Sequence, residues 1–238
     1  MNEDINPMLR KLDALQALSD GDQFALKSIY SRTIDYEAHI DIAREGDRVG
    51  ECGLLMSGIA CRYSMTTEGK RQITGFVVPG DIFDVQSFLL DVMDHSIASM
   101  SACTVAVIPH TALVALTENS GRLALAVWRE SLVEAATFRE WVVNVGRRSA
   151  YQRIAHIMCE LYCRLETVGL VEGSTIRWPI TQSDIGDACG LSIVHVNRSL
   201  QALRGNDLIV LQNGILTIKD WDGLAEAGEF DGTFLHRQ

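Results

Sequence analysis

Between residues 33 and 116 the chain consists of short apolar or alternating runs separated by turn-forming residues. The runs are Cys52–Met56, Ile59–Ser64, Gln72–Val78 and Thr104–Ile108. The turn signals are Glu45-Gly46-Asp47, Ser57-Gly58, Glu68-Gly69-Lys70 and Pro79-Gly80-Asp81. Many short strands at this spacing are typical of a β-barrel or a jelly-roll-like sandwich. The segment therefore predicts an all-β domain.

Helical periodicity precedes and follows this segment. Residues 8–30 carry leucines at three-residue spacing and a break at Ser19-Asp20-Gly21, after which Phe24 and Ile29 continue the apolar pattern. Residues 118–146 carry a second stripe in one heptad phase, formed by Leu125, Trp128, Leu132, Ala135 and Val142. Phe138 and Trp141 widen the apolar surface, as expected for a helix that serves both its own barrel and a partner. We expect helix 119–146 to form a homodimer; the alternative is a helix packed on its own barrel alone.

The third segment begins after Arg147-Arg148-Ser149, a candidate hinge. An apolar-striped helix ends near Gly169, and residues 180–209 then predict a helix, a turn and a second helix. Two apolar runs flank Asn213-Gly214, a strong signal for a two-residue hairpin. The pattern predicts three helices followed by a β-wing.

Local signals define the two helices of residues 180–209. Thr181 is the expected N-cap of the first helix, Gly190 is expected to reverse the chain with positive φ, and Ser192 caps the second helix. The second helix buries Val196, Leu200 and Leu203. Its outer surface then carries Ile193, Val194, His195, Asn197, Arg198 and Gln201. Such a surface either reads bases in a DNA groove or is a solvated helix face.

With these landmarks and "RIAHIM" (153–158), most of residues 30–220 resembles the Crp/Fnr superfamily of bacterial transcription regulators. The resemblance implies an α+β chain with an N-terminal double-stranded β-helix (jelly-roll-like) sensor domain, a long dimerisation helix and a C-terminal winged helix-turn-helix. The expected limits are 1–117, 118–147 and 148–222, with an acidic tail at 223–238. The implied protein is a homodimeric regulator without enzymatic activity that binds a palindromic DNA operator and RNA polymerase.

The resemblance also assigns roles on the second helix of the motif. Arg198 occupies the guanine-reading position, whereas Val194 replaces the usual glutamate and Ile193 replaces an arginine. His195 and Asn197 are candidates for other base or phosphate contacts, and Val194 for a thymine methyl group. The expected phosphate contacts come from Thr181, Gln182 and Ser192. This helix is therefore expected to read a different half-site from the best-known relatives.

The ligand residues of known relatives are missing. The resemblance places Asp84-Val85 and roughly Met93-Asp94 where cyclic-nucleotide binders hold ribose and phosphate, and no arginine lies between Arg71 and Arg122. Carboxylates would repel a cyclic phosphate, so we expect no cyclic-nucleotide response. No cysteine precedes Cys52, which argues against an N-terminal iron–sulfur cluster. We expect no cofactor; the open alternatives are a ligand-independent scaffold, an RNA polymerase contact surface, or a redox or haem sensor.

The scattered histidines and cysteines favour structural roles. His39, His95 and His110 are expected to be ordinary surface or loop residues rather than haem ligands. His156, Cys159 and Cys163 share one helix stripe without an evident fourth ligand, so we expect packing rather than a metal site. Cys189 beside the turn is expected to face the core, although its oxidation would disturb DNA docking.

The formal net charge of −10 is unevenly distributed. Residues 1–146 hold 12 Lys/Arg and 20 Asp/Glu, residues 147–219 hold 8 and 6, and residues 220–238 hold 1 and 5. The predicted DNA-binding segment is thus mildly basic, which permits DNA binding without demanding it. No apolar run approaches the roughly 18 residues of a membrane span and no signal-peptide core is evident, so we expect a cytoplasmic protein.

Overall fold

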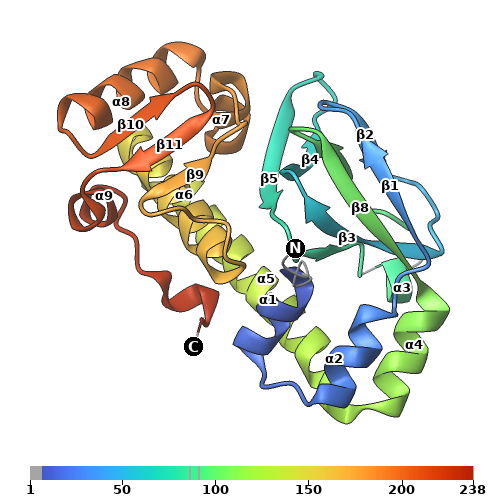
Figure 1. The fold of residues 1–238 in the computed structure, drawn as a ribbon. Coiled ribbons are helices and arrows are strands. Elements are labelled where there is room, and N and C mark those ends of the chain that lie inside the picture. Colours follow the sequence, from blue (N-terminus) through green and yellow to red (C-terminus); the bar gives the residue numbers. More distant parts are fainter. Residues whose placement is uncertain (1–6, 86, 91, 238) are drawn as a thin grey trace. The chain divides into compact units, whose positions relative to one another are not determined.

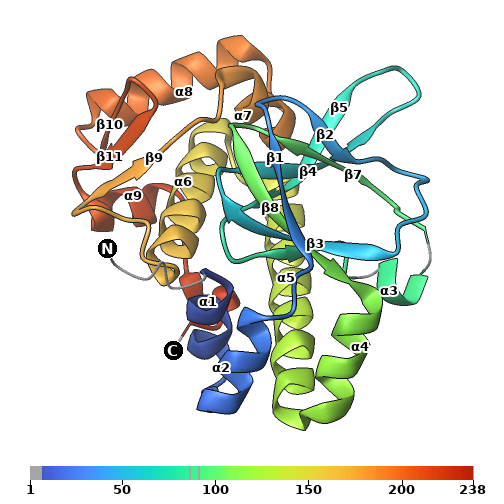
Figure 2. The same cartoon turned by 45° about the vertical axis from the view of Figure 1, so that its right-hand side comes forward.

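The computed structural model describes residues 7–85, 87–90 and 92–237. The chain forms two compact units, the first built mainly from the chain up to Arg62 and from Phe76–Ala135, the second from Tyr63–Gly75 and Ala136–Leu235 (Figures 1 and 2). Among the described residues, no helix is both long and apolar enough to cross a membrane.

Two four-stranded sheets form the β domain, in the orders β1-β8-β3-β6 and β2-β7-β4-β5. The strands are β1 (Arg32–Tyr36), β2 (Asp41–Ala43), β3 (Glu51–Ser57), β4 (Ala60–Met65), β5 (Arg71–Val77), β6 (Ile82–Phe83), β7 (Ser96–Ser99) and β8 (Cys103–Pro109). Buried side chains from both sheets meet in one core, among them Leu55, Val77, Phe83, Ile97 and Val105. This shared core confirms the jelly-roll-like sandwich predicted from the turn signals.

Short helices pack beside this sandwich. They are α1 (Pro7–Leu15), α2 (Asp20–Lys27), α3 (Ser87–Leu90) and α4 (His110–Asn119). Leu9, Leu12 and Leu113 share a second apolar core with residues of β3 and β8. The break predicted at Ser19-Asp20-Gly21 lies earlier, between Leu15 and Asp20, because Ser19 caps α2 in a reciprocal capping box with Asp22 and the helix already starts at Asp20. Phe24, expected to continue the apolar pattern, is exposed instead.

The long helix α5 spans Gly121–Arg147, two residues later than the expected start, because α4 occupies the chain up to Asn119. One side of α5 buries Leu123 and Ala126 in the second core. The opposite side exposes four of the five residues of the predicted stripe, Leu125, Trp128, Leu132 and Val142, while Ala135 is half-buried. Trp141 is buried and donates from Nε1 to Oε2 of Glu160 at 2.8 Å, so it packs within its own chain.

The second unit contains α6 (Ala150–Thr167), α7 (Gln182–Cys189) and α8 (Ile193–Gly205), together with a small sheet. Its strands β9 (Thr175–Arg177), β10 (Ile209–Gln212) and β11 (Ile215–Ile218) are ordered β10-β11-β9. Asn213 and Gly214 join β10 to β11 with φ of 51° and 71°, as a two-residue hairpin turn requires. The winged helix-turn-helix is confirmed, with one strand, β9, that the sequence pattern did not predict.

The segment expected as an acidic tail is folded onto α6. It forms α9 (Trp221–Ala227) and a 3₁₀ turn at Gly232–Leu235, and buries Leu224 and Leu235. The His156 ring of α6 lies 5.2 Å from the Phe230 ring and 5.9 Å from that of Phe234. Aromatic packing therefore holds this acidic segment in place.

Candidate DNA-binding interface

Reciprocal capping fixes the start of α7. The Thr181 hydroxyl accepts from the Asp184 backbone N–H at 3.2 Å, and Asp184 Oδ2 accepts from the backbone N–H of Thr181 at 3.0 Å. Asp184 Oδ2 also accepts from Thr181 Oγ1 at 2.6 Å. This confirms Thr181 as the N-cap. Asp184 thus engages both donors of Thr181, the backbone N–H and the hydroxyl.

Two glycines permit the tight turn between α7 and α8. Gly190 adopts φ 64° and ψ 41°, the left-handed conformation expected for a reversal of the chain. At Gly186 an added Cβ would lie 2.8 Å from the carbonyl oxygen of Leu191, too close for any side chain. Ser192 then caps α8 through the backbone N–H of His195, as predicted. The turn thereby sets where the first residues of α8 point.

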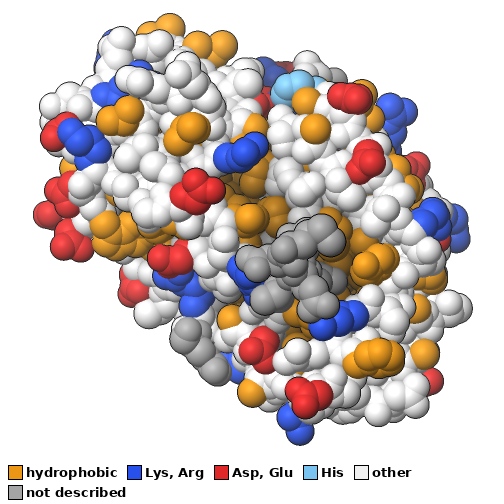
Figure 3. All heavy atoms as spheres, viewed as in Figure 1, with side chains coloured by type: hydrophobic (Ala, Val, Ile, Leu, Met, Phe, Trp, Pro, Cys, Tyr) orange, Lys and Arg blue, Asp and Glu red, His pale blue; other side chains and the backbone are white. Residues whose placement is uncertain are grey.

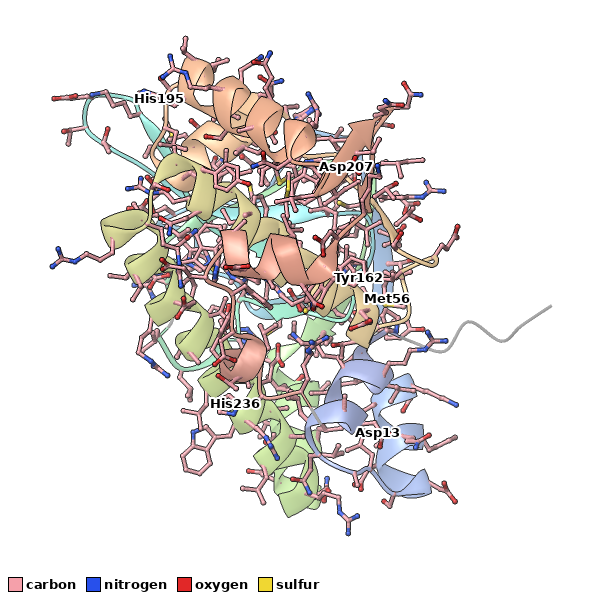
Figure 4. All side chains as sticks on the ribbon, turned by 90° about the vertical axis from the view of Figure 1, so that its left-hand side faces the viewer. Asp13, Met56, Tyr162, His195, Asp207 and His236 are labelled. Carbon is pink, nitrogen blue, oxygen red and sulfur yellow. The ribbon has the colours of Figure 1, made fainter. Side chains whose placement is uncertain are left out.

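The two faces of α8 separate as predicted. Val196, Leu200 and Leu203 are buried. The other face exposes Ile193, Val194, His195, Asn197, Arg198 and Gln201. Figure 4 shows His195 at the outer edge of this helix. The structure therefore brings one exposed apolar pair and four exposed polar side chains together on one short helix.

Few interactions within the chain occupy this polar surface. Asn197 Nδ2 lies 3.5 Å from Gln182 Oε1, and His195 Nδ1 lies 3.2 Å from Ser192 Oγ. The side chain of Arg198 is exposed and, within the described part of the chain, makes neither an ion pair nor a hydrogen bond. Its guanidinium is thus available for the fork-like contact to guanine O6 and N7. On the face drawn in Figure 3, acidic and basic side chains are interspersed rather than gathered in one basic patch.

A buried carboxyl group marks the position that the resemblance assigns to the ligand pocket of the β domain. Asp84 is 4% exposed with φ 66°, and its Oδ1 has no hydrogen-bond partner among the described residues. Burial raises the pKa of Asp84 to about 7, against the opposing effect of Arg62. Arg62, buried on β4, pairs with Glu134 of α5 at 2.6 Å.

Sequence reasoning missed Arg62, because it precedes the interval from Arg71 to Arg122 in which a phosphate-binding arginine was expected. Its guanidinium is already paired with a carboxylate. Asp94, on the second predicted ligand position, is exposed and contacts His95. The region therefore offers carboxylates, and an arginine held by a carboxylate, to any phosphate.

The six cysteines are buried and are not joined in disulfides, and His156 is buried as well. Burial raises the pKa of the Cys189 thiol to about 12 and lowers the pKa of His156 to about 4. Across residues 7–85, 87–90 and 92–237, no three His, Cys, Asp or Glu residues are arranged to hold a metal ion. The geometry of the His156, Cys159 and Cys163 stripe is that of core packing.

Comparisons with known proteins agree with this architecture. Residues 152–227 match a Crp-like helix-turn-helix domain, and residues 33–120 match a cyclic nucleotide-binding domain. The chain is 30% identical over 181 residues to the transcriptional activatory protein AadR of Rhodopseudomonas palustris, covering 73% of this chain and 72% of that protein. It is 27% identical over 158 residues to the nitrogen fixation regulation protein FixK of Azorhizobium caulinodans, covering 66% of this chain but only 63% of that protein.

The fold is also found among solved structures. That of FixK2 from Bradyrhizobium japonicum matches with a TM-score of 0.75 at 20% identity, covering 82% of this chain and 96% of the other. The two domain matches, the likeness to AadR and the order of sandwich, long helix and winged helix-turn-helix agree with one another. The chain belongs to the Crp/Fnr superfamily of transcription regulators.

Proposed function

We propose that the protein is a homodimeric transcription factor that binds a palindromic DNA operator through α8. The observation that carries this proposal is the exposed face of α8, on which Arg198 is unpaired among the described residues while the opposite face is buried in the unit. A helix presented in this way by a helix-turn-helix enters the major groove with its first residues at the base edges. Arg198 is the principal base-reading residue.

The apolar pair at the start of α8 determines which bases the proposed half-site contains. Ile193 is 58% exposed and Val194 is 67% exposed, so both are free to meet a base edge. An apolar side chain in the major groove discriminates through the methyl group of thymine. The proposed half-site therefore combines a guanine read by Arg198 with a thymine beside Val194. His195 and Asn197 contribute base or phosphate contacts, and Gln182, Ser192 and Thr181 lie on the phosphate side.

The exposed stripe on α5 supports the dimer. Trp128, Leu132 and Val142 are 64%, 56% and 73% exposed, and Leu125 and Ala135 share their heptad phase. Large apolar side chains in a heptad phase are covered by a second helix of the same kind in a two-stranded coiled coil. Two copies of α5 would place two reading helices on half-sites about one helical turn apart.

We further infer that the β domain does not respond to cyclic nucleotides. The support is the buried Asp84 and the pairing of Arg62 with Glu134, which leave a phosphate with no free arginine at this position among the described residues. The proposed organisation keeps 1–117 as the sensor-type domain, 118–147 as the dimerisation helix and 148–222 as the DNA-binding domain, in a cytoplasmic, non-enzymatic protein. The second candidate is a ligand-independent regulator whose β domain is a scaffold or an RNA polymerase contact surface. A thermal-shift screen against cyclic nucleotides, haem and metabolites separates a sensor from a ligand-independent regulator, because only a protein that binds one of these ligands changes its unfolding temperature.

The test of the DNA-binding proposal is selection of bound sequences from random duplexes, followed by Arg198→Ala. We expect the selection to enrich a palindromic sequence. Arg198→Ala should lose about 1–3 kcal/mol of binding free energy per contacted base and should discriminate less at that base pair. Arg204→Ala removes the same charge from the last turn of the same helix and should weaken all sequences equally. If Arg198→Ala keeps the affinity and selectivity of the wild type, the assignment of the reading helix is wrong.

A further inference from the structure

The turn end of the β4–β5 hairpin belongs to the same compact unit as the helix-turn-helix. Residues 63–75 group with 136–235. From this hairpin Arg71 Nη2 donates to Oδ1 of Asp184 at 2.5 Å, and its Nε donates to Oδ2 of Asp187 at 2.8 Å. One guanidinium therefore bridges two carboxylates that are one turn apart on α7.

Two further contacts hold the hairpin in this place. Gln72 Nε2 donates to the carbonyl oxygen of Ala188 at 3.3 Å. The Arg71 guanidinium carbon lies 6.0 Å from the centre of the Tyr63 ring, within range of a cation–π contact. The two Arg71 hydrogen bonds and the Gln72 hydrogen bond thus hold the hairpin against α7, and the Tyr63 ring packs beside the Arg71 guanidinium, so Arg71 is not a mobile surface charge.

The two carboxylates lie close to the proposed DNA contacts. Asp184 uses its Oδ2 for the cap of α7 and its Oδ1 for Arg71, so both of its oxygens are engaged. Asp187 follows Gln182 by five residues, an axial rise of about 7.5 Å, which is comparable with the screening length of about 8 Å at physiological ionic strength. Without Arg71, two negative charges would act on phosphates bound at the start of α7.

We propose that Arg71 is a positioning residue for DNA binding: by bridging Asp184 and Asp187 it offsets the acidity of α7 and docks the hairpin on it. The proposal rests on the assignment of α7 and α8 as the DNA-contacting helices. Arg71, Asp184 and Asp187 together carry a net charge of minus one. Operator affinity then depends on a residue more than a hundred positions before the helix-turn-helix, through charge and not through base contact.

A charge-balanced pair of variants tests this idea. Arg71→Gln takes the cluster to minus two, Asp187→Asn takes it to zero, and the double variant returns it to minus one. Operator dissociation constants are measured by fluorescence anisotropy on the selected duplex between 0.05 and 0.5 M salt, a range over which the screening length shortens to a few ångströms, about 4 Å. We expect Arg71→Gln to weaken binding about two- to fivefold at low salt, with the deficit shrinking at high salt. Asp187→Asn should bind slightly more tightly, and the double variant should match the wild type.

Asp184 is left unchanged in this design because its substitution would also remove the cap of α7. Arg71→Lys keeps the charge without the fork and should keep the salt dependence of the wild type. Arg44→Gln, which breaks an exposed ion pair with Asp41 of the first unit, controls for the loss of one net charge. Urea unfolding of each variant separates a change in binding from a change in folding.

The proposal is overturned if Arg71→Gln binds as tightly as the wild type or more tightly. It is also overturned if adding Asp187→Asn to Arg71→Gln does not restore the operator affinity. A contact with a purely structural role would stay broken in the double variant, whereas a charge effect would be cancelled. Should Arg71→Gln not fold, Asp187→Asn decides alone, since unchanged affinity contradicts the electrostatic role. If Arg198→Ala leaves operator affinity and selectivity unchanged, the assignment of the DNA-contacting helices is refuted instead. Failure of the Arg71 proposal and failure of the proposed function are therefore distinguishable.

Discussion

Replacing Asp84 by Asn should make the protein more stable at neutral pH and remove part of its pH dependence. The carboxyl group is buried, and its Oδ1 is without a hydrogen-bond partner within the part of the chain that the structure describes. Burial is the main reason that the pKa of Asp84 is raised from 3.8 to about 7; Arg62 opposes this rise, while Glu134 and Asp94 add to it. Asn is nearly the same size and tolerates the observed φ of 66°, so the substitution isolates the charge.

The sign and size of the effect come from proton linkage. Between pH 3.8 and about 7 the folded state holds a proton on Asp84 that the unfolded state has released, so the free energy of unfolding falls as pH rises through this window. A tenfold change in proton affinity corresponds to about 1.4 kcal/mol, which gives a ceiling of about 4 kcal/mol at pH 8. Below pH 4 both states are protonated and the penalty disappears. Asp84→Asn should therefore gain nothing at pH 4 and most at pH 8.

The assay is urea unfolding of wild type and Asp84→Asn at half-unit steps of pH. Glu37→Gln serves as control, because it removes an exposed carboxylate of the same unit. We expect the difference in unfolding free energy between Asp84→Asn and wild type to rise across the window, and the Glu37→Gln difference to stay small. A difference for Asp84→Asn that is constant with pH would refute the reasoning, since the carboxyl group would then not be a buried, ionising group.

Three further substitutions test the proposed dimer contact of α5, the contact between α5 and α6, and the turn between α7 and α8. Leu132→Lys should yield a folded monomer in sedimentation experiments, because it places a charge on the exposed stripe of α5; an unchanged dimer would exclude this seam. Trp141→Phe should cost about 1.5–3 kcal/mol in urea unfolding, because Glu160, fully buried, loses a donor and keeps Arg164; a neutral result would mean that water replaces the indole. Gly190→Ala should cost about 1–2 kcal/mol from the left-handed backbone alone, since Val145 lies 3.8 Å from the added Cβ; a much larger loss would indicate a steric clash instead.

The helix-turn-helix was predictable because its signals are local. The cap at Thr181, the left-handed Gly190 and the Asn213-Gly214 turn each depend on residues a few positions apart. The buried face of α8 follows from helical periodicity alone, which also identified the exposed residues opposite it. In the β domain the turn glycines located the longest strands for the same reason.

The elements that escaped sequence reasoning are short and depend on tertiary packing. Strand β9 has three residues and is defined by its pairing with β11. Helix α9 has seven residues, too few to be stable alone, and is held by contacts with α6. Helix α4 was assigned to the β domain because it follows β8 without an intervening turn signal. Composition identified the acidity of the last segment but not the aromatic side chains that anchor it.

The ion pairs of two arginines could not be predicted from sequence patterns, for a different reason. Arg62 and Arg71 lie on neighbouring strands, where a charged residue is normally interpreted as solvent-facing. Arg62 pairs with Glu134. Arg71 pairs with Asp184 and Asp187, which follow it by 113 and 116 positions. No local period links residues so far apart, so these pairs become visible only in the folded chain. Both arginines bear on the candidate functions, because Arg62 lies near Asp84 in the β domain and Arg71 pairs with two carboxylates of α7.

The net charge of −10 therefore says little about DNA binding in this protein. Charges act on a bound phosphate mainly within a screening length of about 8 Å, so the carboxylates that matter are those nearest the reading helices. On α7 those carboxylates are Asp184 and Asp187, and both are paired with Arg71. Five more acidic residues lie in the last segment, which is folded against α6 rather than free to sweep over α8. Local pairing and local folding, rather than total charge, leave the exposed face of α8 open to an anionic duplex.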